Sequence, residues 1–280
     1  MEPEFSSPIL TPERIDELIA VYRDGLLDDV MPFWFPRSID EEFGGFMFAR
    51  GRDGTLLDDD KGVWQQGRAA WLLATLYSEV EARPEWLAWS KHGVDFLRRH
   101  CFDADGRMFF TVTRDGRPLR KRRYVFSEAF AIAALAAYGR AAHDAEAVQQ
   151  ALQLYQQVLG YLDTPGHLPP KWNPETRPMK GLAIPMILIV TAQILRTAVD
   201  DPSQCNAWID RSIAEIQRDF MHPEFDAVLE TVGPNGAFLD HFDGRTMNPG
   251  HSIEAAWFIL HEAKLRNDQE FLKSGLTILD

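Results

Sequence analysis

The feature that most constrains the fold is a repeated order of helix, helix and hairpin-bearing loop. Apolar residues recur at steps of three and four, which is the spacing of one face of an α-helix. A first helix is expected behind Thr11-Pro12-Glu13, because threonine caps helices well and proline suits their first turn. About eight more helices are expected at 62–82, 85–101, 125–142, 145–163, 182–199, 204–220, 251–266 and 268–279.

Three connecting segments have a different pattern. At 44–55, 102–116 and 225–236, an apolar or aromatic stretch adjoins a turn that contains glycine. This pattern is typical of small β-hairpins. Repeated helical hairpins bury their apolar faces by stacking on one another, either in an open solenoid or in a closed ring.

The composition of the helices favours the ring. Segments 126–138 and 182–195 are apolar nearly all round, as expected of helices covered on both sides, whereas 145–159 keeps a polar face. We therefore predict an all-α fold, an (α/α) barrel of paired helices with short β-hairpin loops. No segment reads as a linker, so residues 1–280 are expected to form a single domain.

Charge and hydropathy exclude several classes of protein. The formal net charge of −13 disfavours non-specific binding to nucleic acid or to anionic membranes. No stretch reaches the roughly 18 apolar residues that a membrane span needs. The N-terminus lacks a signal-peptide pattern, and Cys101 and Cys205 lack the spacing of a disulfide or zinc framework, so a cytoplasmic protein with free thiols is expected.

One basic run, 120–123, interrupts the acidic background. It reads either as a solvated entrance to the next helix or as a contact for an anion or a substrate. Known phosphate-binding, nucleophile-elbow and metalloprotease motifs are missing from the sequence, and its histidines show no metal-ligand spacing. We therefore predict no metal site.

The segment 248–258 (NPGHSIEAAWF) is the best catalytic candidate. Pro249 and Gly250 interrupt the preceding structure, so a helix is expected from about His251 or Ser252. Glu254 lies one turn after His251 and could orient the imidazole as a general acid–base. A histidine at a helix end with a local hydrogen bond is the alternative. Four residues should form an apolar stripe on this helix: Ile253, Ala256, Trp257 and Leu260.

A second candidate segment is 63–71 (VWQQGRAAW). Arg68 lies among apolar and small residues, where a guanidinium needs an acceptor from a buried carboxylate or from a ligand. Tyr124 and Glu128 lie four apart at a helix start. Glu230 and Asp240 flank the loop before the His251 helix, where acidic residues are more often surface or capping groups.

Four segments together resemble the N-acylglucosamine 2-epimerase family, which also contains cellobiose 2-epimerases. They are VWQQGRAAW, RRYVFSEAF, RPMKGLAIPMIL and NPGHSIEAAWF, and the likeness extends over nearly the whole chain. The resemblance implies an (α/α)6 barrel of twelve helices with its active site at one mouth. It also implies interconversion of N-acetylglucosamine and N-acetylmannosamine, or of a related aldose pair.

The resemblance further assigns residue roles. A proton leaves C2 of the open-chain sugar, an enediolate-like intermediate forms, and a proton returns on the opposite face, with two histidines as acid–base groups. His251 matches the first histidine, Arg68 the arginine that stabilises the oxyanion, and Glu254 the carboxylate partner of the histidine. Tyr124, Glu230, Trp64, Met186 and Asp240 are expected to contact the sugar.

Two departures from the family pattern accompany the resemblance. Cellobiose epimerases have a histidine next to the equivalent of Met186, whereas this chain reads Ile184-Pro185-Met186-Ile187, which favours a monosaccharide. Family members also continue past the equivalent of Asp280, through a segment that supplies the second histidine. The chain is therefore expected to be truncated at its C-terminus, with a barrel that lacks the final helices.

Three functions stay open on this basis. The leading one is an epimerase acting on an aldose or N-acyl hexosamine, with no required cofactor; the resemblance leaves room for ATP as an activator and for a homodimer. The second is an aldose–ketose isomerase of the same family. The third is a fragment that binds sugar or protein without catalysis. A glycoside hydrolase is disfavoured because it needs a pair of carboxylates rather than a histidine motif.

Overall fold

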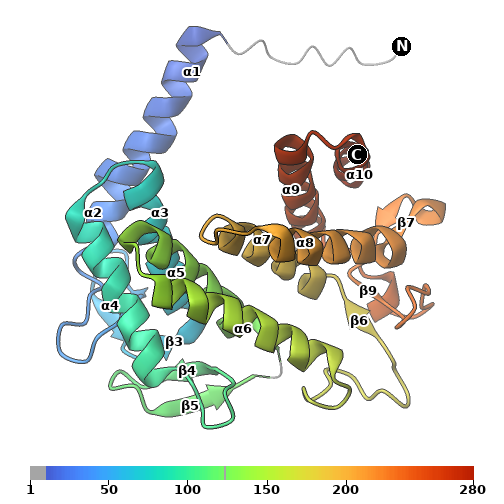
Figure 1. Ribbon diagram of the computed structural model, residues 1–280, viewed down its shortest axis with the longest axis horizontal. Helices are drawn as coiled ribbons and strands as arrows, with labels where there is room; N and C mark the ends of the chain where they lie inside the picture. Colours follow the sequence, from blue (N-terminus) through green and yellow to red (C-terminus); the bar gives the residue numbers. More distant parts are fainter. Residues whose placement is uncertain (1–10, 123) are drawn as a thin grey trace.

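The computed structural model describes residues 11–122 and 124–280, which form a curved row of paired helices (Figure 1). The first helix begins as α1 (Pro12–Ile19), continues through a π-helical stretch (Ala20–Val30) and ends as α2 (Met31–Trp34). Thr11 caps α1 by accepting a hydrogen bond of 3.2 Å from the backbone N–H of Arg14. The predicted helix start is thus confirmed.

The remaining helices form four pairs. α3 packs on α5, α5 on α7 and α7 on α9, and each of these four also packs on the helix that follows it. An inner row is therefore covered by an outer row, as the barrel prediction requires. The pairs are α3 (Val63–Glu79) with α4 (Pro84–His100), α5 (Phe126–Ala142) with α6 (Ala145–Asp163), α7 (Ala183–Arg196) with α8 (Ser203–Glu215), and α9 (Pro249–Arg266) with α10 (Gln269–Leu279).

Burial follows the two rows. In α5 every residue from Ser127 to Ala136 is buried, and α7 buries most of its residues, which confirms the inner helices. The outer helix α6 buries one face only, at Ala147, Ala151, Leu154, Tyr155, Val158 and Tyr161. The helix ends lie within about three residues of those predicted, and a five-residue π-helical stretch (Ile216–Phe220) extends α8.

The short strands lie in the loops between helix pairs, and all of them pair antiparallel. β1 (Ala49–Arg50) pairs with β2 (Leu56–Asp58), and β4 (Phe109–Val112) pairs with both β3 (Lys61–Gly62) and β5 (Pro118–Lys121). The first two predicted hairpins are therefore confirmed. The third is wrong in detail: β8 (Ala227–Val228) pairs back with β7 (Met221–His222), and β9 (Thr231–Val232) pairs with the distant β6 (Lys180–Gly181).

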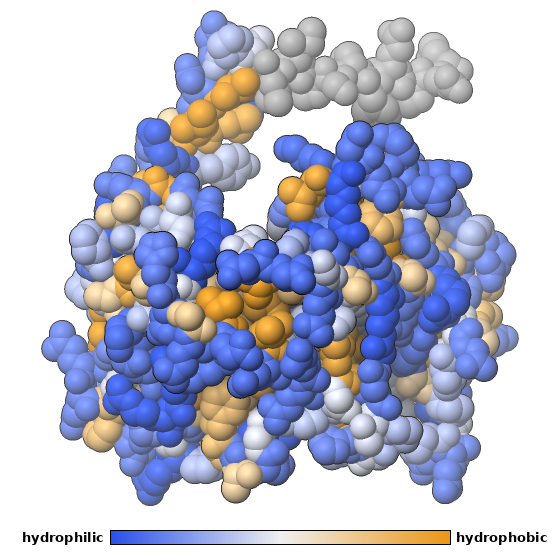
Figure 2. Space-filling view, viewed as in Figure 1, coloured by the Kyte–Doolittle hydropathy of each residue, from blue (hydrophilic) through white to orange (hydrophobic). Residues whose placement is uncertain are grey.

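The predicted apolar stripe on α9 is confirmed for Ala256, which is buried, and wrong for Ile253 and Trp257, and α9 begins at Pro249, two residues earlier than predicted. Ile253 and Trp257 are 56% and 58% exposed, whereas Ala255, Phe258 and Ile259 are buried. The reason is that α7 and α10 cover other faces of α9, and spacing alone cannot tell which face will meet a neighbour. The apolar side chains of α1 are also exposed, and they appear as an orange strip in Figure 2.

Two predictions from composition can be compared with the structure. Cys101 and Cys205 are free and buried, as expected, and burial raises the pKa of the Cys205 thiol to about 11. Among the described residues, no helix is long and apolar enough to cross a membrane.

Candidate functional site

The first turns of α3 explain the WQQGR motif. The buried Gln66 accepts a hydrogen bond from Phe46 N–H (2.7 Å) and donates one to Phe46 O (2.9 Å), which fixes the loop before β1. Gly67 lets α3 approach α5 closely, because a Cβ there would lie 2.6 Å from the carbonyl oxygen of Phe130. These two residues set the position of the next one, Arg68.

Arg68 is more exposed than its apolar neighbours suggest. Its guanidinium carbon lies 4.6 Å from the ring centroid of Phe130 and 5.9 Å from that of Trp64. No carboxylate pairs with it among the described residues. Of the two alternatives for Arg68, the described residues therefore do not provide the buried carboxylate. The cation packs on aromatic faces, and its nitrogens are free to bind a ligand.

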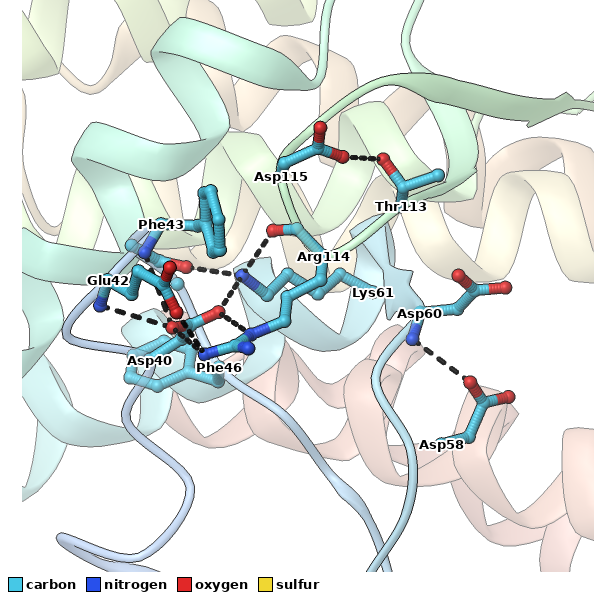
Figure 3. A network of polar contacts seen from close by, with 12 residues as sticks. Asp40, Glu42, Phe43, Phe46, Asp58, Asp60, Lys61, Thr113, Arg114 and Asp115 are labelled. Atoms are coloured by element: carbon cyan, nitrogen blue, oxygen red, sulfur yellow. Dashed lines mark hydrogen bonds and ion pairs between the residues drawn. The ribbon is translucent and has the colours of Figure 1, made fainter.

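A buried ionic network anchors the start of α3 (Figure 3). The ammonium of Lys61 donates to Asp40 Oδ2 (2.8 Å), to Gly44 O (2.6 Å) and to Arg114 O (2.7 Å). The Arg114 guanidinium also donates twice to Asp40. Burial opposes ionisation of Asp40, but the hydrogen bonds from Arg114 and Lys61 outweigh it and hold its pKa at about 2. The turn at 40–44, strand β3 and the turn between β4 and β5 are thereby joined just before Trp64.

The inner helices enclose a largely apolar cavity of about 470 Å³. Three of the residues predicted from the sequence line it together, namely Arg68 from α3, Met186 from α7 and Glu254 from α9. Phe130 and Trp257 add aromatic faces to the wall, and its charged groups are Arg68, Glu254 and the ion pair of Arg140 with Glu79. That combination is typical of small-molecule sites.

His251 lies one turn before Glu254 on α9, yet its partner is a different carboxylate. Nδ1 of His251 lies 2.9 Å from Oε2 of Glu230, with side-chain exposures of 34% and 21%. The expected contact with Glu254 is therefore replaced, because side chains on a helix lean toward its N-terminus and bring His251 to the preceding loop. Glu254 instead lies among the cavity residues.

The position of Glu230 is set by its backbone. Its N–H donates to Thr246 O (3.0 Å), and its carbonyl accepts from Leu182 N–H (3.0 Å) at the start of α7. The next residue pairs with Gly181 in the β6–β9 ladder. Asn248 caps α9 through the His251 N–H. The carboxylate and the imidazole are thus held by separate elements that meet at one point.

The other candidates differ in their placement. Tyr124 packs edge-on against Phe126, next to Trp64. Glu128 is fully buried and accepts from Arg107 (2.7 Å), so it is a structural partner rather than a surface group. Asp240 has a side-chain exposure of 82% and pairs with Arg245 in its own loop, which makes it the one predicted contact placed on the open surface.

No metal site was predicted from the sequence. Among the described residues, the one cluster with suitable donor spacing is Asp58, Asp59 and Asp60, which are all exposed. Sequence reasoning also missed Trp257 as a cavity residue and Glu230 as the partner of His251. Trp257 was missed because it was assigned to a buried stripe. Glu230 was missed because its position depends on the β6–β9 pairing, which no local sequence pattern predicts.

Comparison with known proteins identifies the family and the fold of the chain. Residues 44–278 match the family model described as N-acylglucosamine 2-epimerase (GlcNAc 2-epimerase). The N-acylglucosamine 2-epimerase of Bos taurus is 34% identical over 264 residues, which cover 91% of this chain and 63% of that protein. The chain thus spans about three-fifths of the length of this relative.

Two solved structures show the same fold. A cellobiose 2-epimerase from Bacillus thermoamylovorans superposes with a TM-score of 0.82 at 20% identity, over 94% of this chain and 71% of that one. A D-mannose isomerase superposes with a TM-score of 0.73 at 18% identity, over 100% of this chain and 71% of that one. The helical row is therefore that of the (α/α) barrels in these enzymes. On the family match and the identity to the bovine enzyme, the chain belongs to the N-acylglucosamine 2-epimerase family.

Proposed function

We propose that the protein is a sugar 2-epimerase that removes the proton at C2 of an open-chain N-acyl hexosamine, or of a related aldose, with His251 as the base. The hydrogen bond between His251 Nδ1 and Glu230 Oε2 is the observation that carries this proposal. A carboxylate on Nδ1 fixes the neutral imidazole with its proton on that nitrogen. The lone pair is then on Nε2, which has no hydrogen-bond partner among the described residues.

Arg68 supports the same reaction step. Removal of the C2 proton places negative charge on the carbonyl oxygen at C1, which becomes the oxyanion of an enolate, or of an enediolate where C2 carries a hydroxyl group. A fixed cation that is not neutralised by a carboxylate stabilises such charge well. Arg68 meets this condition, because its guanidinium lies on Phe130 and Trp64 rather than on an acidic residue. We assign it the role of oxyanion stabiliser.

Epimerisation also needs a proton donor on the opposite face of C2. His261 lines the same cavity, but it follows His251 by ten residues, which is about 15 Å along an α-helix. Both imidazoles therefore cannot reach one carbon atom. The described residues account for one of the two proton transfers, and this transfer can be tested separately.

We propose substrate contacts both in the cavity wall, which Met186 and Glu254 line, and on the adjoining aromatic rings, where Trp64 packs against Phe130 of the wall. We assign the sugar to the region between Trp64, Tyr124 and Met186, with Glu254 as an acceptor for a sugar hydroxyl. Trp257 joins this set because it lies beside Glu254 in the cavity wall. Asp240 is left out on account of its exposure. We also propose that residues 1–280 form a single barrel domain.

The test is exchange of the C2 hydrogen with solvent. Incubation with N-acetylmannosamine in heavy water should introduce deuterium at C2, because exchange needs one base and no second acid–base group. The His251→Asn variant should lose exchange by about 10²–10⁴-fold, the usual contribution of a general base. No exchange in the wild-type protein, under conditions where the sugar binds, would refute the proposal.

Aldose–ketose isomerisation is the second candidate, favoured by the structural likeness to D-mannose isomerase. It shares the enediolate but delivers the proton to C1. Chromatography of the products from mannose separates the two reactions, since a ketose indicates the isomerase and the C2 epimer the epimerase. A non-catalytic sugar-binding role would show binding without exchange, and binding would persist in His251→Ala.

Finer properties complete the proposal. The reaction involves no net oxidation or reduction, so we propose that no cofactor is required. ATP as an activator is tested by adding it to the exchange assay, and a homodimer by sedimentation. We place the protein in the cytoplasm, where the free thiols of Cys101 and Cys205 would stay reduced.

A further inference from the structure

The described residues of the basic run at 120–123 differ in how their charges are compensated. Lys121 binds Asp103 (2.8 Å) and Asp105 (2.5 Å), so its charge is compensated. Arg120 is exposed on β5. Arg122 has no carboxylate partner among the described residues, and its Nε is shielded from solvent without a hydrogen-bond partner there. A shielded donor of this kind is costly unless something binds it.

Arg122 lies at the end of a row of aromatic rings that begins at Arg68. Its guanidinium carbon is 4.7 Å from the ring centroid of Phe110 and 6.0 Å from that of Tyr124. Phe110 is 6.1 Å from Trp64, which in turn is 5.9 Å from the Arg68 guanidinium. Two uncompensated guanidinium groups therefore flank one aromatic surface, and apolar sugar faces stack readily on such rings.

The backbone at Arg122 is held by hydrogen bonds from a buried arginine, Arg107. Nη2 of Arg107 donates to the carbonyl oxygens of Arg122 and Tyr124, at 3.2 Å each. Arg107 is itself held by the fully buried Glu128. The Arg107–Glu128 pair thus positions both the guanidinium and the tyrosine ring before any ligand arrives, which lowers the entropic cost of binding.

We propose that Arg122 binds an anionic substituent, a phosphate or a carboxylate, on the end of the sugar remote from C2. The planar guanidinium matches both groups by paired hydrogen bonds. The inference rests on the proposed function, because Arg68 at the reacting end fixes the direction of the sugar along the aromatic row. It narrows the substrate class to acidic derivatives of the hexosamine, which the names of the relatives do not suggest.

The test compares three ligands by titration calorimetry: N-acetylmannosamine, its 6-phosphate, and the uronic acid with a carboxylate at C6. Wild-type protein should bind at least one of the two anionic sugars about tenfold more tightly than the neutral one. Comparing the 6-phosphate with the uronic acid shows whether a phosphate or a carboxylate is preferred. Arg122→Gln should abolish this preference and leave the affinity for neutral sugar within about twofold. Arg122→Lys should keep part of it.

Arg120→Gln is the matched control, because it removes the same charge from the same run at an exposed position. It should keep the preference for the anionic sugar. Equal affinities of the wild-type protein for all three ligands would overturn the inference, as would an equal loss in Arg120→Gln, which would indicate general charge attraction. Deuterium exchange at C2 with the neutral sugar is scored separately, so failure of the proposed function would be recognised independently.

Discussion

Two histidine–glutamate pairs in this molecule have the same short contact and different surroundings. His251 and Glu230 meet at 2.9 Å through Nδ1, and so do His222 and Glu224. In the second pair, the residues are two apart in one turn, and Nε2 of the histidine already contacts the carbonyl of Asp219 at 3.3 Å. In the first, the residues are 21 apart, and Nε2 has no partner among the described residues.

The difference shows what makes such a pair suited to chemistry. The His222 imidazole uses both nitrogens inside the protein, and the hydrogen bond from it lowers the pKa of Glu224. It therefore stabilises a turn. The His251 imidazole uses one nitrogen and keeps the other for a ligand, on the helix that also carries Glu254 into the cavity. The free nitrogen, rather than the carboxylate contact, distinguishes the candidate base.

The largest effect is expected from Glu230→Gln. The amide can donate to Nδ1, which would move the imidazole proton to Nε2 and remove the base. C2 exchange should fall about 10³-fold, or about 4 kcal/mol, as tautomer reversal does in other histidine-based sites. Glu224→Gln is the matched control and should change exchange by less than about twofold. Comparable losses in both variants would show that the two pairs do not differ in function.

The next largest effect, on stability, is expected at Glu262. This carboxylate lies near the C-terminal end of α9, and both of its oxygens accept hydrogen bonds. Glu262 is buried and accepts from Arg196 (2.6 and 2.8 Å), Gln193 (2.9 Å) and Arg266 (2.7 Å), which join α7 to α9. Glu262→Gln should cost about 3 kcal/mol of unfolding free energy in urea titrations, because Arg196 loses its partner. Glu17→Gln, in an exposed pair with Arg14, should cost less than about 0.5 kcal/mol.

The smallest effect concerns acid stability. The pKa of Asp40 is held at about 2, below its usual 3.8, so its contribution is present above pH 3.8 and is lost as the pH falls toward 2. The shift corresponds to about 2 kcal/mol. Urea titrations should show wild type losing more stability than Asp40→Asn between pH 5 and pH 2.5. Parallel pH profiles would mean that the Lys61–Arg114 network does not depend on this charge.

The sequence predicted most of the fold because helices depend on local periodicity. All eight helices from α3 to α10 were expected, and the inner ones were recognised from the apolar run in α5 and α7. The exposure of Trp257 was not predicted, because the spacing of apolar residues does not reveal which face of a helix packs against a neighbouring helix. The β6–β9 pairing also escaped, since it joins strands about 50 residues apart.

The candidate site was predicted only in part, because local patterns reveal its individual residues but not all of their partners. Arg68, Met186 and Glu254 were expected and do share a cavity. The His251 partner was assigned to Glu254, three residues away, while the structure places Glu230 there through contacts with Leu182 and Thr246. Long-range partners of this kind depend on tertiary packing, which local spacing does not encode.

The tautomer of His251 tests the central claim most directly. Nitrogen NMR of ¹⁵N-histidine-labelled protein, with His251→Asn to assign the signals, reports which ring nitrogen carries the proton. The account predicts a neutral ring with its proton on Nδ1 and the lone pair on Nε2, and the reverse tautomer in Glu230→Gln. A proton on Nε2 in the wild-type protein would contradict it, because His251 could not then accept the C2 proton.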